Sequence, residues 1–174
     1  MSNPVSNPVS ITRTFPAGGK FTGPQRALYD LVLASQDAAV AATKAGNRFN
    51  DPHEATVKVL AQGMLDVGLL DANKVGSVDD VIEKRAYFPF YMHRTSHWLG
   101  MDVHDVGAYF GPKLAADARV DAKMAHRKLE AGMVITVEPG LYFQPDDLLV
   151  PEDLRGIGVR IEDDILITED GFVN

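Results

Sequence analysis

The stretch GMVITVEPGLYF, residues 132–143, decides the fold class of this chain. It is a short, nearly continuous apolar run of the kind that forms a buried strand. A second stretch, GVRIEDDILIT at residues 158–168, alternates apolar and polar side chains before an Asp-Gly turn, and it also predicts a strand. The segments that precede both stretches have helical patterns. Because helices come first and strands follow, the order favours an α+β fold over alternating βαβ units.

Three helices are predicted in the first half of the chain. Residues 21–47 carry apolar side chains at helical spacing, with Pro24 in the first turn and a stop at Gly46. A second helix is predicted to begin at Asp51. A third is signalled by Ser77, which has an acidic residue three positions later as in a capping box.

The chain is predicted to form one domain after a short lead. With 174 residues and 45% hydrophobic composition, it is long enough to bury a core. Residues 1–10, MSNPVSNPVS, form an extended polar lead without the basic and apolar regions of a secretion signal, and residues 11–174 form the domain. Residues 111–132 have weak periodicity and are predicted to be a loop or short helix that joins two strand regions.

Charge and cysteine content exclude several classes of protein. The formal net charge of −7 argues against nucleic-acid binding, which depends on clustered lysine and arginine. No run approaches the roughly 18 apolar residues of a membrane span. The chain has no cysteine, so any metal site must use histidine and carboxylate ligands.

Three of the five histidines, His93, His97 and His104, fall in the stretch HRTSHWLGMDVHDVG. The first two are four residues apart, a spacing that brings both rings together if the backbone there is helical. A single histidine is more often a satisfied core or surface residue than a ligand, but three so close together favour a functional site. His53 and His126 have no such company and are predicted to be structural.

Glu138 ends the apolar part of the first strand, directly before Pro139 and Gly140. An unpaired carboxylate at the mouth of a buried strand is destabilising, so a positive group is expected beside it. The sequence leaves equally open the alternative that this glutamate turns outward to solvent as the strand ends.

In the second strand, a period of two places Arg160, Glu162 and Asp164 on one face. Such charge usually marks the solvated face of an edge hairpin. In the functional interpretation, Arg160 keeps a neighbouring carboxylate ionised so that it can bind a metal. Together, the histidines and carboxylates form a sulfur-free ligand set that suits Mn, Co, Fe or Zn, and they predict a metal-dependent hydrolase.

Three stretches together, HRTSHWLGMDVHDVG, LEAGMVITVEPGLYF and RGIGVRIEDDILIT, resemble the signature segments of the Xaa-Pro aminopeptidases, the aminopeptidase P branch of the pita-bread metallopeptidases. ITRTFPAGGKFTGPQRALYDLVLASQDAA, which begins at residue 11, resembles the same family. The resemblance implies a partial pita-bread (creatinase/aminopeptidase-like) fold, a curved antiparallel sheet with helices packed outside. It also implies hydrolysis of the bond between an N-terminal residue and proline by a metal-activated hydroxide.

The resemblance further implies roles for individual residues. The residues that match the family's metal ligands are His97, Glu138 and Glu162, the last of which bridges two Mn²⁺ or similar ions (Co²⁺, Zn²⁺, Fe²⁺) in the family. The residues that match its catalytic and supporting groups are His93, His104 and Arg160. The first two of these would contact substrate and stabilise the transition state, and Arg160 would support the bridging glutamate.

One departure from the family pattern stands at Ser10. Family members carry an aspartate ligand directly before the Ile-Thr-Arg-Thr-Phe-Pro segment and another further upstream. In this chain the position is Ser10, and residues 1–10 contain no Asp, Glu or His. Two family ligands are therefore expected to be absent, so the site, which holds two ions in the family, is expected to hold one ion or none in this chain. Residues 11–174 are interpreted as a catalytic domain that lacks its N-terminal part.

The missing ligands leave two alternatives to an active Xaa-Pro aminopeptidase. One is a non-catalytic peptide-binding module or pseudoenzyme with the same fold, and the other is a prolidase-like dipeptidase. Loss of the first half would uncover a sheet edge and an apolar face, so a homodimer is expected. The expected ligands are proline-containing peptides, with no nucleic acid or membrane partner, and the expected location is cytoplasmic.

Overall fold

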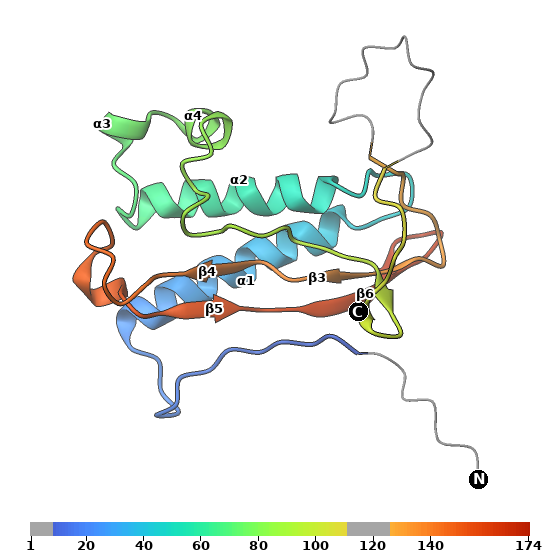
Figure 1. Ribbon diagram of the computed structural model, residues 1–174, viewed down its shortest axis with the longest axis horizontal. Coiled ribbons are helices and arrows are strands. Elements are labelled where there is room, and N and C mark those ends of the chain that lie inside the picture. The colour runs from blue at the N-terminus through green and yellow to red at the C-terminus, as the bar shows by residue number, and fades with distance from the viewer. Residues whose placement is uncertain (1–8, 111–125) are drawn as a thin grey trace.

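The computed structural model describes residues 9–110 and 126–174 of the chain. Helix α1 (Gly23–Ala42) lies against the strands, and α2 (Asp51–Asp66) lies alongside α1 (Figure 1). The short elements before the main strands are α3 (Ala72–Val75), α4 (Val78–Glu83), β1 (Leu99–Gly100) and β2 (Val103–His104). The later elements are β3 (Val134–Val137), β4 (Gly140–Tyr142), the 3-10 helix η1 (Glu152–Leu154), β5 (Gly158–Arg160), β6 (Asp163–Ile167) and β7 (Phe172–Val173).

Helix α1 begins where the sequence predicts and ends earlier. Thr22 and Gln25 form a capping box, in which each side chain accepts a hydrogen bond from the other residue's backbone N–H. The predicted stop at Gly46 is wrong, because the helix ends at Ala42. The Thr43 hydroxyl donates to the carbonyl of Ala39, and Gly46 has φ +88°, a value that a helix does not contain.

The other two helix predictions also hold at their starts. Helix α2 begins at Asp51 as predicted, although its N-cap is Asn50, whose side chain makes no capping hydrogen bond. Helix α4 follows Ser77, which forms the predicted capping box with Asp80. A capping box therefore sets the start of α4, whereas Pro52 in the first turn favours the start of α2. Of the predicted connection at 111–132, residues 111–125 lie outside the described part of the chain.

The two predicted strand stretches are antiparallel partners, and both are interrupted at the same level. Strand β3 pairs with β6, and β4 pairs with β5. The breaks fall at Glu138–Pro139 in one stretch and at Ile161–Glu162 in the other. The register is the same on both sides of the break, so Glu138 lies directly opposite Glu162.

An extended segment, residues 9–15, lies antiparallel to the second of these stretches at Glu162 and runs along the lower edge of Figure 1. The backbone N–H of Thr12 donates to the carbonyl of Glu162, and the N–H of Glu162 donates back. On this segment, Val9, Ile11 and Phe15 are 60%, 59% and 77% exposed. The edge of the sheet therefore presents apolar side chains to solvent.

The main core lies between α1, α2 and the β4–β5 pair. Leu28, Leu60, Tyr91, Leu141 and Ile161 are among its buried members. Burial of such side chains is the dominant favourable term in folding, and it fixes the helices against the strands. Among the described residues, no helix combines the length and apolar character needed to cross a bilayer.

Candidate metal centre

The backbone around His97 is irregular, and β3 holds it in place. The N–H of His97 donates to the Thr136 hydroxyl at 3.1 Å, and the N–H of Thr136 donates to the His97 carbonyl at 3.0 Å. The ring Nδ1 lies 2.9 Å from the carbonyl oxygen of Trp98. Because a carbonyl can only accept, Nδ1 carries the proton and the Nε2 lone pair is free. This arrangement of a metal-binding histidine is common, since the backbone bond fixes the tautomer.

Glu138 faces this nitrogen. Its Oε1 lies 3.4 Å from Nε2 of His97, and its Oε2 lies 3.5 Å from Nη1 of Arg160. The side chain is 13% exposed, so the alternative of a glutamate turned outward is wrong, and the expected positive group is Arg160. Burial raises the pKa of Glu138 to about 7, the charge of Glu162 acts in the same direction, and Arg160 opposes both.

Glu162 is buried directly across the break. Its Oε1 accepts a hydrogen bond from the Ser10 hydroxyl at 2.6 Å, and its Oε2 accepts one from the Thr12 hydroxyl at 2.5 Å. Like charges directly opposite each other on paired strands are destabilising. The opposition of Glu138 and Glu162 is therefore an arrangement that a bound cation would relieve.

His97, Glu138 and Glu162 together form a set that could hold a metal ion. One ligand atom from each of them lies within 4.8 Å of the others. A free imidazole lone pair and two carboxyl groups converge here, which is a favourable arrangement for a divalent cation. The residues present therefore fit a metal. The sequence prediction of this ligand set remains a prediction, now with compatible geometry.

Arg160 and His93 meet at a tyrosine that the sequence analysis did not single out. The Arg160 Nε–H donates to the Tyr142 hydroxyl at 2.7 Å, and that hydroxyl lies 2.8 Å from Nε2 of His93. The His93 Nδ1 lies 2.8 Å from the carbonyl of Arg94, so Nδ1 carries the proton and Nε2 accepts from Tyr142. The three side chains form a chain of hydrogen bonds beside Glu138.

The backbone between His93 and His97 is not helical, so the two rings do not meet through helical spacing. Instead, the ring of His104, on β2, stacks on His97 with centroids 3.9 Å apart and planes at 26°. His104 is exposed, which places its ring at the solvent side of the cluster. Thus all three histidines surround the site, but their predicted roles toward substrate remain untested.

The loop that carries His93 and His97 is anchored by a residue from α2. The Thr95 hydroxyl lies 2.6 Å from the Tyr91 hydroxyl and 3.0 Å from Nδ1 of His53. Burial and nearby positive charge lower the pKa of His53 to about 4. The structural role predicted for His53 is therefore an anchoring role near the site.

Alternation along β6 separates two sets of acidic groups. Asp163, on the face opposite Glu162, accepts from Gln36 of α1 at 2.8 Å and forms an ion pair with Arg13 at 2.5 Å. Glu162 is 5% exposed and Asp163 is 7% exposed. The interpretation of this stretch as a solvated hairpin face is therefore wrong.

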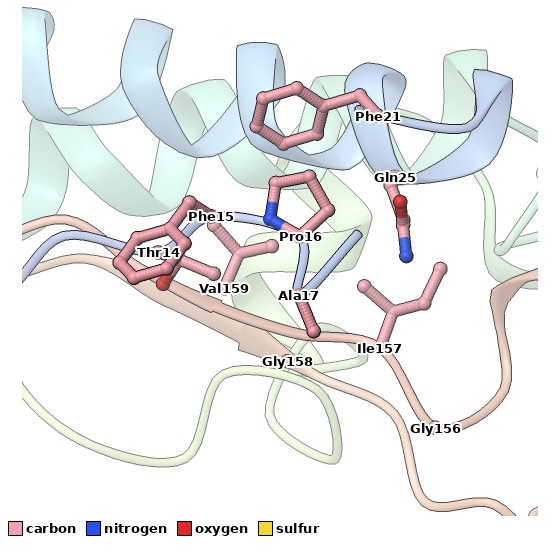
Figure 2. Close-up of a pocket in the computed structure, with 10 residues that line it drawn as sticks. All are labelled: Thr14, Phe15, Pro16, Ala17, Phe21, Gln25, Gly156, Ile157, Gly158 and Val159. Atoms are coloured by element: carbon pink, nitrogen blue, oxygen red, sulfur yellow. The ribbon is translucent and has the colours of Figure 1, made fainter. Parts of the chain in front are cut away.

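An apolar hollow of about 200 Å³ lies beside β5 and the start of α1 (Figure 2). Phe15, Pro16 and Phe21 form one side, and Ile157 and Val159 form another. Figure 2 shows that these side chains converge, and Gln25 reaches in from α1. The hollow adjoins the segment that carries Thr12, but it contains none of the candidate metal ligands.

Comparison with known families and proteins places the site in context. The profile of metallopeptidase family M24 matches residues 8–169. The Xaa-Pro aminopeptidase of Haemophilus influenzae is 48% identical over 161 residues, which cover 92% of this chain and 34% of that protein. The chain thus spans about a third of the length of this relative.

Solved structures that superpose on this chain are also aminopeptidases. An aminopeptidase of Pseudomonas aeruginosa superposes with a TM-score of 0.82 at 48% identity, covering 94% of this chain and 34% of that one. Aminopeptidase P from Escherichia coli, solved with the inhibitor Pro-Leu, superposes with a TM-score of 0.80 at 46% identity, again over 94% of this chain and 34% of that one.

Proposed function

The chain belongs to metallopeptidase family M24, and from this membership we propose that it acts as a metal-dependent Xaa-Pro aminopeptidase, releasing an N-terminal residue that precedes proline. The predicted α+β, partial pita-bread fold is confirmed by the structural matches. That the similar proteins are named aminopeptidases supports this activity over a prolidase-like dipeptidase or a non-catalytic binding module.

The observation that carries the proposal is the convergence of His97, Glu138 and Glu162 at the paired strand breaks. These three residues would hold the ion. When bound, a divalent ion would lower the pKa of water and polarise the scissile carbonyl. Mn²⁺ is the ion we propose, with Co²⁺, Zn²⁺ and Fe²⁺ as ions that the same donor set accommodates.

The remaining polar groups would orient the substrate and the ligands. Arg160 opposes the rise in the pKa of Glu138 and so favours the ionised, ligating form. His104, at the solvent side, would donate an N–H to the substrate or to the negative charge that develops on its carbonyl oxygen. His93 would act beside it, with its ring orientation fixed by Tyr142 and the Arg94 carbonyl.

Proline-containing peptides are the proposed substrates, which the Pro-Leu inhibitor of the Escherichia coli enzyme supports. We also propose a homodimer, because Val9, Ile11 and Phe15 expose an apolar sheet edge. No nucleic-acid or membrane partner is proposed. A cytoplasmic location suits a chain without cysteine.

The activity is tested by incubating the purified chain and Mn²⁺ with a short Xaa-Pro peptide. Release of the N-terminal residue is monitored by mass spectrometry. The matched substrate carries alanine in place of proline. We expect release from the proline peptide alone, and loss of release with EDTA or in the His97→Ala variant. Binding of Mn²⁺ without any release would contradict the aminopeptidase proposal and favour the binding module.

A further inference from the structure

The most specific contacts at the candidate metal centre come from the extended segment 9–15. Ser10 and Thr12 each donate a hydroxyl hydrogen bond to a different oxygen of Glu162, at 2.6 and 2.5 Å. The segment itself is tied down independently. Thr12 exchanges two backbone hydrogen bonds with Glu162, and the Arg13 guanidinium pairs with Asp163. The two hydroxyls are therefore held in position by contacts other than those they make with the carboxylate.

These two hydrogen bonds fix the orientation of the carboxylate and leave it able to bind a cation. A carboxylate offers about four lone-pair sites, two on each oxygen. One hydroxyl on each oxygen uses half of them and opposes rotation of the group. Hydrogen bonds from O–H groups to an ionised carboxylate are short and about twice as strong as those between neutral groups.

The other two ligand candidates are restrained in a similar way. The Nδ1 of His97 is bound to the Trp98 carbonyl, and Oε2 of Glu138 faces Arg160. His97 turns Nε2 and Glu138 turns Oε1 toward the site, and each oxygen of Glu162 keeps an unused lone pair. Among the described residues, only His97, Glu138 and Glu162 form such a group. The one further carboxylate on this face of β6, Asp164, accepts from the backbone N–H of Ser10.

From this geometry we infer that Ser10 and Thr12 are positioning residues that orient Glu162, and that the site holds one divalent ion per chain. The inference rests on the proposed metal-binding function. Sites with two ions hold them about 3.5–4 Å apart and need protein donors for both. Three donors instead match sites that hold one ion and leave an open position for water or substrate.

The experiment is a titration of the metal-free full chain with Mn²⁺. Calorimetry measures the affinity and the number of bound ions, and electron paramagnetic resonance detects coupling between ions. We expect one ion per chain and the spectrum of isolated Mn²⁺ without coupling between ions. Thr12→Val and Ser10→Ala should each weaken Mn²⁺ binding by about 10- to 100-fold, the usual effect of losing a partner of a ligand. Thr12→Ser keeps the hydroxyl and should restore binding.

Thr14→Val is the matched control. Its hydroxyl lies on the same segment but bonds only to the backbone of Arg160, as donor to the carbonyl at 2.8 Å and as acceptor from the N–H at 3.0 Å. We expect its Mn²⁺ affinity to equal that of the wild-type chain. Thermal unfolding of all variants without metal separates a loss of fold from a loss of ligand orientation. If Thr12→Val does not fold, Ser10→Ala and Thr12→Ser decide the question.

The outcomes separate the inference from the proposed function. A wild-type chain that binds no Mn²⁺ would overturn the metal site and, with it, the proposed function. Binding of two ions, or a coupled spectrum, would overturn the one-ion inference alone. Equal affinity in the wild-type, Thr12→Val and Ser10→Ala chains would show that the hydroxyls do not position Glu162.

Discussion

His53 should make the stability of the metal-free chain depend on pH. Its ring lies in the first turn of α2, 3.0 Å from the Thr95 hydroxyl and with its centroid 5.8 Å from that of Tyr91. Burial is the main cause that lowers its pKa from 6.5 to about 4, and the positive charge of Arg94 adds to it. The ring is therefore neutral in the folded protein at neutral pH.

The sign and size of the effect follow from linkage. In the unfolded chain the ring takes up a proton near its ordinary pKa of about 6.5. Because the folded pKa is depressed, the stabilisation is present in full above pH 6.5 and is lost as the pH falls toward 4. At about 1.36 kcal/mol for each pKa unit, the upper limit is about 3 kcal/mol, and we expect about 2 kcal/mol for this partly exposed ring.

The assay is urea unfolding of the wild-type chain and the His53→Gln variant, both with EDTA. The difference between their free energies of unfolding should become less favourable to the wild type by about 2 kcal/mol between about pH 7.5 and about pH 4.5. Other titrating groups are common to both proteins and cancel to first order. Above pH 7.5 the difference should be constant. A difference that is the same at both pH values would refute the assignment of a buried neutral His53.

Three further predictions address the site and the core. His97→Ala should abolish Mn²⁺ binding measured by calorimetry, with only a modest loss of metal-free stability, and unchanged affinity would exclude His97 as a ligand. Ser10→Asp should tighten Mn²⁺ binding by about 10-fold or more, because a carboxylate replaces a neutral hydroxyl beside Glu162. Ser10→Asn should not tighten it. Equal Mn²⁺ affinities of the two variants would place residue 10 away from the ion. Leu60→Ala should lower the free energy of unfolding by about 2–5 kcal/mol in urea titrations, since Leu60 is fully buried, and a loss below about 1 kcal/mol would contradict its place in the core.

Helix starts could be predicted because local chemistry determines them. The capping box at Ser77 and the start at Asp51 need only neighbouring residues. The end of α1 was missed by four residues because the Gly46 N–H donates to the carbonyl of Leu129 instead of a helical carbonyl, and the Asn47 side-chain amide donates to the carbonyl of Ala42. The bond from Gly46 to Leu129 joins residues far apart in the sequence, and hydrophobic periodicity does not encode such a contact.

In the candidate site, too, features set by neighbouring residues could be predicted, and features set by distant residues could not. Alternation placed Arg160, Glu162 and Asp164 on one face, and the structure agrees, but nothing local indicates that Glu138 stands opposite Glu162. That relation depends on the register of two separate strands. Tyr142 was missed although a signal existed, since it shares the strand face of Glu138 by a period of two. The ligand roles themselves came from family resemblance.

The contacts between residues 9–15 and residues 162–164 join two segments that are far apart in the sequence. Ser10 and Glu162 are 152 residues apart in sequence. During synthesis, the hydroxyl donors leave the ribosome long before the carboxylate that they orient, at a rate of about 5–20 residues per second. A site built from these residues could therefore assemble only after Glu162 has been synthesised. An ion held by the proposed site would then bind only after the segment 9–15 has docked on Glu162, so that metal binding would report the pairing of these two distant segments.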